Sequence, residues 1–485
     1  MPDLGLQNIL RIAIQLAGPN NLPPGPIGLP FVGCIPYMKP RAHLLLANWV
    51  KKYGPVISFR MGSRIVVVLG TADAVKEALV KQADVFSGRV PPMLPKFLQV
   101  SKTGHMGLIN SQGELWKEQR RFALTVLRDL GIGRRVMEKN IENEIGYVFD
   151  EIDKVTDQPF DPQVLLNNAV SNIICTLVYG KRFAYNDAEF LSMIDSMNYL
   201  VSRAGTTILT SHNYFPILVL FTNFFRVRNA AKAINAFSTQ QINQLRATFA
   251  FDQEFSNYTE AFLKAQQAAE QGQYFSDKQL YAAISNLFIA GSETTATTLR
   301  WSLLFMGRYP DVQLRVQQEL DTVLGLGTLP EWGDRIKLPY TEAVIMEVQR
   351  LSNLTPMALP HRTTEATTLY GYHIPDDTIV LPLLFSVQMD EDTFGSDAGQ
   401  FNPDRFLNPD GKTHKKYEGF MPFSTGKRVC LGESLARMEL FCFFSALLAR
   451  YRFHFDGIEK PDSDNYFAGI TVTPAPFKII AQSRI

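Results

Sequence analysis

The chain has 485 residues, of which 46% are hydrophobic and 20% are charged, and its formal net charge is +1. This balance is typical of globular proteins and excludes disordered, collagen-like and mucin-like chains. A polybasic nucleic-acid binder is excluded as well, because positive and negative charges nearly cancel. Four scattered cysteines without CxxC pairs argue against a disulfide framework and against a four-thiolate zinc site.

The first 21 residues predict an amphipathic helix rather than a membrane span. Polar side chains interrupt the apolar ones and fall on one side at helical spacing: Gln7, Asn8, Arg11 and Gln15. Such a helix lies either on the protein's own surface or in a membrane interface, as a short or truncated anchor. Residues 214–225 form a second uncharged apolar stretch, which is too short to span a bilayer. It is expected either to pack in the core or to dip into lipid.

The remaining chain, 22–485, is expected to form a single catalytic domain. Residues 22–33 are rich in proline and glycine and predict an extended lead-in. Residues 56–69 hold two β-rich runs and predict a hairpin. Helical patterns then recur along the chain, at 71–82, 114–128, 135–155, 164–179 and most of 187–325. β-rich character returns at 378–385 and 467–481, so the fold class is mainly α with small β-sheets.

The pattern richest in chemistry runs from Phe423 to Gly432, with the sequence FSTGKRVCLG. Cys430 stands at the start of a predicted apolar helix, 433–450, where backbone N–H groups and the nearby Arg428 would stabilise a thiolate. Glycines here would let the backbone approach a flat ligand, and Phe423 could shield the sulfur. A lone thiolate in an amide-lined loop suits the proximal side of an iron porphyrin. The alternative is a plain buried cysteine, which is the expectation for the other three, Cys34, Cys175 and Cys442.

A second pattern, AGSETT at 290–295, lies inside an apolar helix predicted over about 278–306. Glu293 and Thr294 are polar within a segment that otherwise packs. A hydroxyl in mid-helix can bond backward to a carbonyl, and small residues let a planar ligand approach. Taken alone, the pattern could equally be a helical kink without chemical meaning.

Together these segments resemble the cytochrome P450 superfamily. Phe423–Gly432 matches the family's haem loop, FxxGxRxCxG, at all five fixed positions. Glu347–Arg350 matches ExxR, 401–406 resembles the PERF segment with Asp404 in place of Glu, and Trp116–Arg120 matches WxxxR. The resemblance covers nearly the whole chain and is strongest to the microsomal class that includes the animal family 2 monooxygenases. It implies the cytochrome P450 fold enclosing a haem.

The resemblance implies haem b as cofactor, with Cys430 as the axial ligand of the iron. Glu293 and Thr294 would deliver protons on the oxygen-binding side, as catalytic residues. Glu347, Arg350 and Arg405 would form a buried structural network behind the haem. The other residues implied to contact the cofactor are Trp116, Arg120, Ala290, His361, Phe423, Ser424 and Arg428.

By position, the substrate pocket should be mainly apolar and dry. The residues expected to line it, besides Ala290 and Thr294, are Leu108, Ile109, Asn110, Phe288, Thr355, Ala358, Leu359 and Ile470. Asn286 stands where many relatives place an Asp that can bind a basic substrate, so cation recognition is disfavoured.

The expected function is that of a haem-thiolate monooxygenase, which inserts one atom of O2 into a small hydrophobic substrate such as a steroid, fatty acid, other lipid or xenobiotic. An isomerase or dehydratase acting on a peroxide without O2 is the first alternative, and the Glu293–Thr294 pair argues against it. A non-catalytic haem protein is the second.

Because the chain has no flavin or nicotinamide signature, electrons should come from NADPH-cytochrome P450 reductase, with cytochrome b5 as a second candidate. The expected location is the cytosolic face of the endoplasmic reticulum membrane, either peripheral or anchored. Basic residues could form the docking face for an acidic redox partner, namely Arg120, Arg121, Arg128, Arg134, Arg135, Lys412, Lys415, Lys416 and Lys427.

Overall fold

The computed structural model describes residues 21–39, 41–90, 106–204, 224–250, 252–268 and 274–484. The amphipathic segment expected at 1–21 and the apolar stretch expected at 214–225 lie almost wholly outside these residues. Within them, the lead-in, the hairpin and the helices occur where the sequence predicts them.

Helices make up most of the described chain. The α-helices are α2 (Ala42–Tyr53), α3 (Ala72–Lys76), α4 (Gly113–Asp129), α5 (Arg135–Asp153), α6 (Pro162–Tyr179), α7 (Ala188–Asn198), α9 (Phe224–Thr248), α10 (Tyr258–Ala268), α11 (Asp277–Arg308), α12 (Pro310–Leu324), α13 (Pro339–Ser352), α14 (Leu384–Gln388), α15 (Glu391–Phe394) and α16 (Glu433–Arg450). Short 3-10 helices are η1 (Ile35–Tyr37), η3 (Val85–Ser87), η7 (Trp332–Lys337) and η8 (Pro403–Phe406), and π-helical segments are η2 (Glu77–Lys81) and η4 (Tyr199–Ala204).

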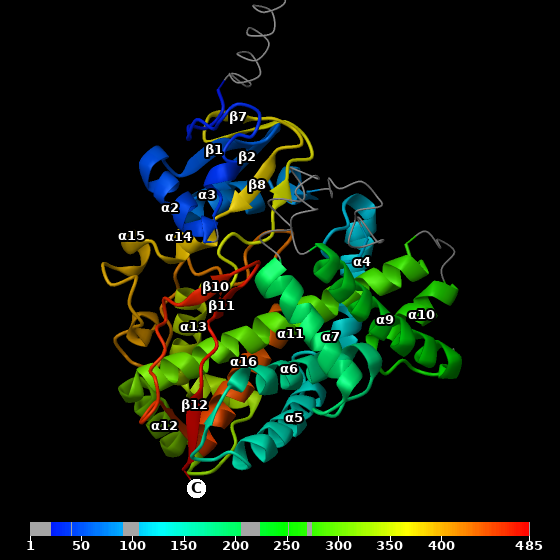
Figure 1. The fold of residues 1–485 in the computed structure, drawn as a ribbon, viewed down its shortest axis with the longest axis vertical. Coiled ribbons are helices and arrows are strands. Elements are labelled where there is room, and N and C mark those ends of the chain that lie inside the picture. The colour runs from blue at the N-terminus through cyan, green and yellow to red at the C-terminus, as the bar shows by residue number, and fades with distance from the viewer. Residues whose placement is uncertain are drawn as a thin grey trace, which may run out of the picture.

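The strands are short and fall into small separate sheets. They are β1 (Val56–Met61), β2 (Arg64–Leu69), β3 (Gly88–Arg89), β4 (Pro159–Phe160), β5 (His361–Arg362), β6 (Thr367–Leu369), β7 (Tyr372–Ile374), β8 (Ile379–Pro382), β9 (Tyr451–His454), β10 (Tyr466–Ala468), β11 (Val472–Pro474) and β12 (Ile479–Ser483). The largest sheet has the order β1-β2-β8-β5-β3 and lies at one end of the molecule, beside α2 and α3 (Figure 1).

The predicted hairpin forms the edge of this sheet. β1 and β2 pair antiparallel from Val56–Leu69 to Met61–Arg64, as expected for two β-branched runs joined by a two-residue turn. The lead-in runs extended beside it, because its prolines cannot donate within a helix. The Ser58 N–H donates to the Pro24 carbonyl at 2.9 Å, which ties the lead-in to β1.

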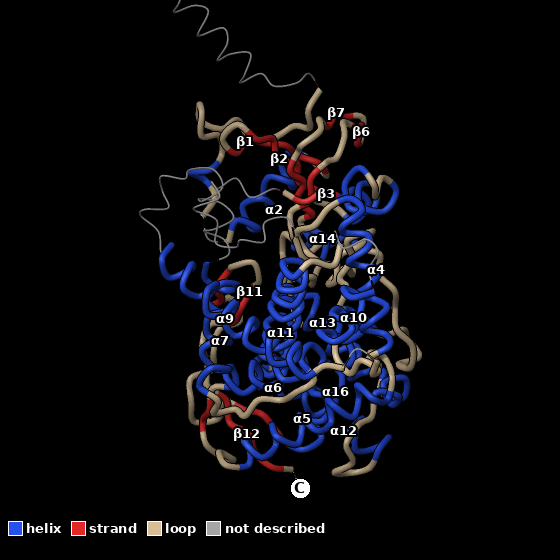
Figure 2. The backbone as a smooth tube through the Cα atoms, turned by 90° about the vertical axis from the view of Figure 1, so that its right-hand side faces the viewer, coloured by secondary structure: helices blue, strands red, loops and turns tan. Residues whose placement is uncertain are grey.

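The helical body is built around α11, which is 32 residues long and contacts α6, α13 and α16 (Figure 2). Ser276 caps its N-terminus by accepting a hydrogen bond from the Gln279 N–H at 3.3 Å. From Ala296 to Met306 every side chain is buried, so this half of the helix is a core element rather than an amphipathic one. Gly291 lets α6 approach closely, since a Cβ there would lie 2.5 Å from Ile174 Cδ1.

The C-terminal strand β11 packs against α11. The Trp301 indole N–H donates to the Val472 carbonyl of β11 at 2.9 Å. α16 spans Glu433–Arg450 as predicted, and every side chain from Met438 to Ala449 is buried. Among the described residues, no helix combines the length and apolar character that a membrane span requires.

Candidate active site

The Cys430 loop is closed by its own backbone. The Cys430 N–H donates to the Phe423 carbonyl and the Val429 N–H donates to the Gly426 carbonyl, both at 3.1 Å. Gly426 has φ +78°, and a Cβ there would lie 1.9 Å from the Leu79 carbonyl oxygen. The glycine is therefore needed for packing against η2. The expectation that the glycines of this loop let the backbone approach a flat ligand stays a prediction.

Cys430 differs from the other cysteines in its surroundings. Its side chain is exposed, whereas Cys34, Cys175 and Cys442 are buried. The surrounding protein raises the pKa of the Cys430 thiol by desolvation, and hydrogen bonds from the Gly432 and Glu433 N–H groups, together with Arg120, act in the opposite direction. These N–H groups open α16, as the sequence predicts. The cation that acts on Cys430 is Arg120, and not Arg428 as the sequence argument assumed.

Three guanidinium groups gather beside this loop, from Arg89, Arg120 and Arg428. Arg120 donates to the Val429 carbonyl at 2.8 Å, and Arg428 donates to the carbonyls of Ser87 at 2.9 Å and Ser111 at 2.7 Å. Within the described ranges none of the three forms an ion pair, and Arg89 Nε and Arg428 Nη1 are buried without any hydrogen-bond partner. Buried cations are normally paired with anions, so this cluster is suited to bind one.

Burial and mutual repulsion lower the pKa values of these arginines. Desolvation, with Arg120 nearby, lowers the pKa of Arg89 to about 10. Desolvation, with Arg89 and Arg120 nearby, lowers the pKa of Arg428 to about 9. Trp116 lies under this group, with its ring centroid 3.9 Å from the Arg428 guanidinium carbon. The predicted Trp116, Arg120 and Arg428 thus come together, and the structure adds Arg89.

His361 lies at the edge of the cluster but carries no charge. It is buried, and desolvation together with Arg89 lowers its pKa to about 3. Its Nδ1 lies 2.7 Å from the Phe86 carbonyl, so the neutral ring donates there. Ser424 adopts the left-handed region at φ +62° within the Cys430 loop, and Phe423 packs beneath Arg437, 4.9 Å from the ring centroid to the guanidinium carbon.

On α11, Ala290 is exposed although it lies in the middle of the helix. The Thr294 hydroxyl bonds backward to the Ala290 carbonyl at 2.7 Å, as the sequence predicts. The residues of this helix do not share one environment, because Gly291 faces Ile174 of α6 while Ala290 is exposed. The expectation that small residues of AGSETT let a planar ligand approach the helix stays a prediction, and it concerns Ala290 rather than Gly291.

Glu293 turns away from Thr294 and into the protein. Its Oε1 accepts hydrogen bonds from the hydroxyls of Thr297 at 3.0 Å, Thr471 at 2.9 Å and Thr473 at 3.4 Å. Its Oε2 is buried without a partner, and desolvation raises the pKa of this carboxyl. Between Glu293 and Thr294, both within the described residues, there is no direct hydrogen bond. A relay through both would therefore need an intervening water.

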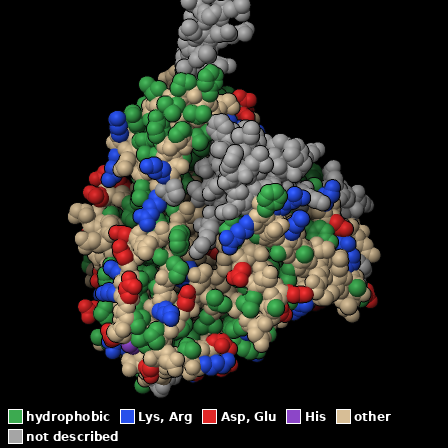
Figure 3. Space-filling model, viewed as in Figure 1, with side chains coloured by type: hydrophobic (Ala, Val, Ile, Leu, Met, Phe, Trp, Pro, Cys, Tyr) green, Lys and Arg blue, Asp and Glu red, His purple; other side chains and the backbone are tan. Residues whose placement is uncertain are grey.

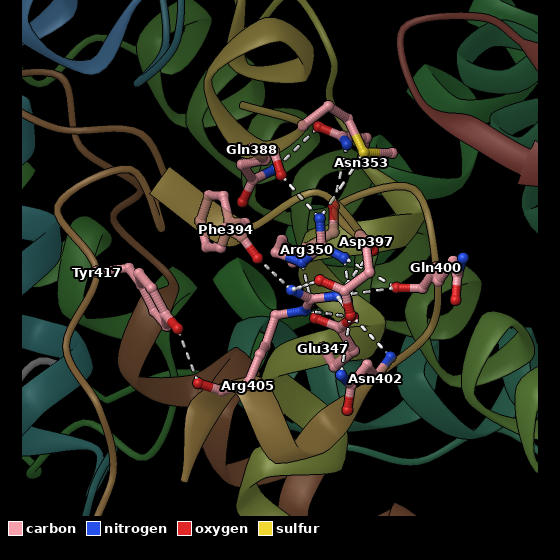
Figure 4. A network of polar contacts seen from close by, with 11 residues as sticks. Glu347, Arg350, Asn353, Gln388, Phe394, Asp397, Gln400, Asn402, Arg405 and Tyr417 are labelled. Carbon is pink, nitrogen blue, oxygen red and sulfur yellow. Dashed lines mark hydrogen bonds and ion pairs between the residues drawn. The ribbon is translucent and has the colours of Figure 1, made fainter. Parts of the chain in front are cut away.

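Glu347, Arg350 and Arg405 lie together, as Figure 4 shows. Arg350 donates to both oxygens of Glu347, at 2.7 and 2.8 Å, and Arg405 Nε donates to Glu347 Oε1 at 3.0 Å. Arg405 also binds Asp397 Oδ2 at 3.1 Å. Asp397 was not predicted, although two buried arginines and one glutamate leave a charge that a second acid must balance. Asp404 is not part of this network and pairs with Arg315 on the surface.

The expected pocket residues are mostly half-buried. Asn110 is exposed, whereas those with intermediate exposure are Leu108, Ile109, Thr355, Ala358, Leu359 and Ile470. Phe288 is only 2% exposed and belongs to the main hydrophobic core, so its burial does not favour a lining role. Arg89 Nη1 donates to the carbonyls of Leu359 and Pro360, both at 3.0 Å, which connects this segment to the arginine cluster.

The basic residues predicted to form one docking face differ in exposure and in ion pairing. Arg120 is half-buried and donates to the Val429 carbonyl, so it differs from the exposed members of this set. Arg121, Arg128, Arg135 and Lys427 pair with acidic neighbours. On the face shown in Figure 3, basic and acidic side chains are interspersed. Arg134, Lys412, Lys415 and Lys416 are exposed and form no ion pair within the described part of the chain.

The residues present fit a haem. Among the described residues, no group of three His, Cys, Asp or Glu side chains could hold a metal ion, so a metal here would need a ligand set that the protein alone does not supply. A porphyrin supplies that set, and Cys430 offers one exposed sulfur at a helix start. The uncompensated arginine cluster beside it suits the porphyrin's propionate carboxylates.

The comparisons with known proteins agree with this geometry. The cytochrome P450 family model matches residues 23–481, and the chain belongs to that family. It is therefore a haem-dependent monooxygenase, an oxidoreductase that uses O2, a redox partner and a hydrophobic substrate.

Individual relatives cover nearly the whole chain. It is 40% identical to cytochrome P450 2K4 of Oncorhynchus mykiss over 96% of this chain and 92% of that protein. It is 38% identical to cytochrome P450 2J2 of Homo sapiens over the same shares, and 37% identical to cytochrome P450 2C23 of Rattus norvegicus over 98% and 96%. The similarity to family 2 that the sequence motifs indicated is thus confirmed.

Proposed function

We propose that this chain, as a single catalytic domain over 22–485, hydroxylates a small hydrophobic molecule such as a steroid, fatty acid, other lipid or xenobiotic. The cofactor is haem b and the electrons come from NADPH-cytochrome P450 reductase, with cytochrome b5 as a further donor. The protein works on the cytosolic face of the endoplasmic reticulum membrane.

The observation that carries the proposal is an exposed cysteine beside an arginine cluster without a counter-ion. Cys430 would hold the iron as thiolate. Desolvation raises the pKa of its thiol, while the N–H groups of Gly432 and Glu433 and the charge of Arg120 act in the opposite direction and favour the anionic form. Arg89, Arg120 and Arg428 hold the propionates, and Trp116 supports Arg428 from below. Bound in this way, haem supplies the activation of O2.

Two residues of α11 hold and transfer the protons that the reaction needs. Thr294 offers its hydroxyl oxygen, because its proton is engaged by the Ala290 carbonyl. Glu293 stores a proton on its buried Oε2, because desolvation raises its pKa and the threonine hydroxyls engage only Oε1. A water between Oε2 and Thr294 Oγ1 completes the path.

Apolar side chains on the lead-in support membrane association. Ile27 is 94% exposed and Phe31 is 76% exposed. The lead-in lies at the end of the molecule that carries β1 and β2 (Figure 1), and hydrophobic side chains gather at this end in Figure 3. Flotation of the full chain with phosphatidylcholine vesicles tests this, and absence of any vesicle-bound protein would contradict it.

The carbon monoxide spectrum of the reduced protein tests the ligation. We expect the strongly red-shifted Soret band of thiolate ligation in the wild type and its loss in Cys430→Ala. The matched variants Cys34→Ala, Cys175→Ala and Cys442→Ala should retain it. Persistence of the band in Cys430→Ala would overturn the assignment.

Oxygen uptake tests the reaction. With reductase and NADPH, substrate-dependent O2 consumption and product hydroxylation are expected. Conversion of an organic hydroperoxide without O2 or reductase, and no uptake with them, would instead indicate an isomerase or dehydratase.

A further inference from the structure

Arg300, on α11 two turns after Glu293, is a fully buried cation. It is 1% exposed, and its guanidinium makes one long hydrogen bond, from Nη2 to the Pro474 carbonyl at 3.4 Å. Its Nε is buried without a partner, and within the described part of the chain Arg300 forms no ion pair. A cation buried in this way is unfavourable unless a negative charge lies close to it.

Glu293 is the acid that faces the same C-terminal segment. The hydroxyls of Thr471 and Thr473 donate to Glu293 Oε1, and the Pro474 carbonyl accepts from Arg300, so both charged side chains lie along β11. Positions seven residues apart fall on one face of a helix, and long helical side chains lean toward the N-terminus. Arg300 is therefore expected to lean toward Glu293.

The two side chains leave complementary atoms free. Arg300 Nε carries an unused N–H donor and Glu293 Oε2 is an unused acceptor, and both atoms are buried. No direct ion pair joins the two residues, which both lie within the described ranges. A water between a buried donor and a buried acceptor satisfies both, and such waters are a regular part of protein interiors.

Few other charges act at this place. Desolvation raises the pKa of Glu293, and among the described residues Arg300 is the charged group that opposes the rise, besides the threonine hydroxyls. Desolvation lowers the pKa of Arg300 to about 10, against the effect of Glu293 and of the exposed Asp161 at the start of α6. On α16, desolvation raises the pKa of Glu439 to about 8, with the Thr295 hydroxyl opposing it, so Glu439 is mostly uncharged at neutral pH.

We propose that Arg300 is a positioning residue for Glu293, which holds the free oxygen of the carboxyl through water and stabilises the carboxylate that remains when the proton has left. The inference rests on the proposed function, in which Glu293 passes a proton toward Thr294. Desolvation alone would make this proton hard to release, and a proton donor works best when its pKa lies near the working pH. The buried guanidinium supplies the opposing charge.

Arg300→Gln tests the proposal, because it removes the charge and keeps an N–H donor for the Pro474 carbonyl. The readout is the infrared band of protonated Glu293, identified as the carboxylic acid band that Glu293→Gln lacks. It is followed against pH in the haem-loaded full chain, without turnover. We expect its midpoint to rise by about one pH unit or more in Arg300→Gln, a tenfold weaker acid, because a nearby opposite charge is lost. Arg300→Lys keeps the charge and should return the midpoint most of the way.

Arg308→Gln is the matched control. Arg308 lies on the same helix, donates to a carbonyl of the C-terminal segment, that of Pro461, and also has a buried Nε without a partner. It lies two turns beyond Arg300 and does not act on Glu293, so its replacement should leave the midpoint unchanged. Equal midpoints in wild type and Arg300→Gln would overturn the proposal, as would equal shifts in the Arg300 and Arg308 variants. Arg300→Met, a neutral apolar replacement, repeats the measurement where Arg300→Gln does not fold.

A second reading uses turnover with reductase, NADPH and a substrate. Arg300→Gln should raise several-fold the share of consumed O2 that is released as hydrogen peroxide. The same change made in Glu293→Gln should add nothing, because Arg300 acts through Glu293. A further increase in the double variant would contradict the inference. Since the infrared reading needs neither O2 nor reductase, failure of the monooxygenase assignment would show only in the uptake assay.

Discussion

At the scale of single residues, Arg89 is the site residue that the sequence did not reveal. It lies on a two-residue strand and shares no recognisable motif with its neighbours. Its side chain is 8% exposed and its Nη1 binds two carbonyls, but no acid. A cation in this position is unfavourable by itself and becomes favourable once an anion is bound. The only signal in the sequence was a lone arginine after a glycine, which usually indicates a surface.

Glu439 of α16 is a second residue whose burial has a measurable consequence. It is 1% exposed, and desolvation raises the pKa of its carboxyl from 4.5 to about 8, with only the Thr295 hydroxyl opposing this. Between these values the folded protein holds a proton that the unfolded chain has released. The free energy of unfolding must therefore fall as pH rises from about 4.5 to about 8.

We expect Glu439→Gln to remove this part of the pH dependence. The variant should gain stability relative to wild type by about 1.4 kcal/mol per pH unit over that window. Urea unfolding of the haem-loaded protein at pH 5.5 and pH 8 measures it. Glu459→Gln, at an exposed position, serves as the control and should leave the slope unchanged. If the free energy of unfolding changes with pH by the same amount in Glu439→Gln and in wild type, Glu439 titrates normally.

At the scale of elements, the charge network joins α13 to η8 and to the segment before it. Glu347 also accepts the Asn402 N–H at 2.9 Å, and Arg350 donates to the Gln388 carbonyl at 2.9 Å. The side chains of this network thus order backbone from several segments that are far apart in sequence (Figure 4). Because Glu347 and Arg350 are 0% exposed, loss of one charge cannot be compensated by water.

Glu347→Gln should destabilise the protein by about 3–5 kcal/mol, because it leaves the buried guanidinium groups without their counter-charge. Asp404 lies on η8, next to Arg405. Asp404→Asn breaks only the exposed ion pair with Arg315 and should lower the free energy of unfolding by about 0–1 kcal/mol. Thermal unfolding, together with the fraction of protein that retains haem, compares the two. Equal effects would mean that burial of the network does not matter.

At the scale of the whole molecule, exposed basic residues remain on the surface although the formal net charge is only +1. Several exposed basic residues lie on α5 and on the loop at 412–416, and some are neutralised by neighbours. Arg135 is 83% exposed and lies 3.7 Å from Glu331, a separation at which exposed pairs contribute little. Its charge therefore remains available to an acidic partner.

Charge reversal at Arg128 and Arg135 should raise the KM for the proposed reductase several-fold and leave kcat with saturating reductase nearly unchanged. The variant should also lose salt sensitivity, because exposed charges are screened over about 10 Å at 0.1 M salt. Lys478→Glu, at an exposed position near the C-terminus, is the control. Unchanged turnover and unchanged salt dependence in the double variant would contradict a docking role.

Local patterns predicted the elements and much of the site. The β-rich runs at 56–69 and the apolar pattern at 433–450 were sufficient to predict the β1–β2 hairpin and α16, because hydrophobic periodicity depends on near neighbours. Likewise, the hydroxyl of Thr294 and its bond to Ala290 are four residues apart in one helix. Contacts between distant segments were not accessible in this way. Asp397 with Arg405 was missed although charge balance required it, and Glu293 with Thr471 joins positions 178 residues apart.

By itself, the sequence determined the family, the helical fold class, the position of Cys430 at a helix start and the residues of the ExxR network. These follow from short motifs, whose spacing is sufficient to specify them. Only the tertiary structure decided that Arg120 rather than Arg428 acts on the thiol, that Arg89 completes a cluster without a counter-ion and that Gly426 and Gly291 serve protein packing. It alone placed Asn286 Oδ1 where it accepts from the N–H groups of Leu108 and Ile109. Burial, orientation and charge balance depend on segments brought together from the whole chain, and no local pattern contains them.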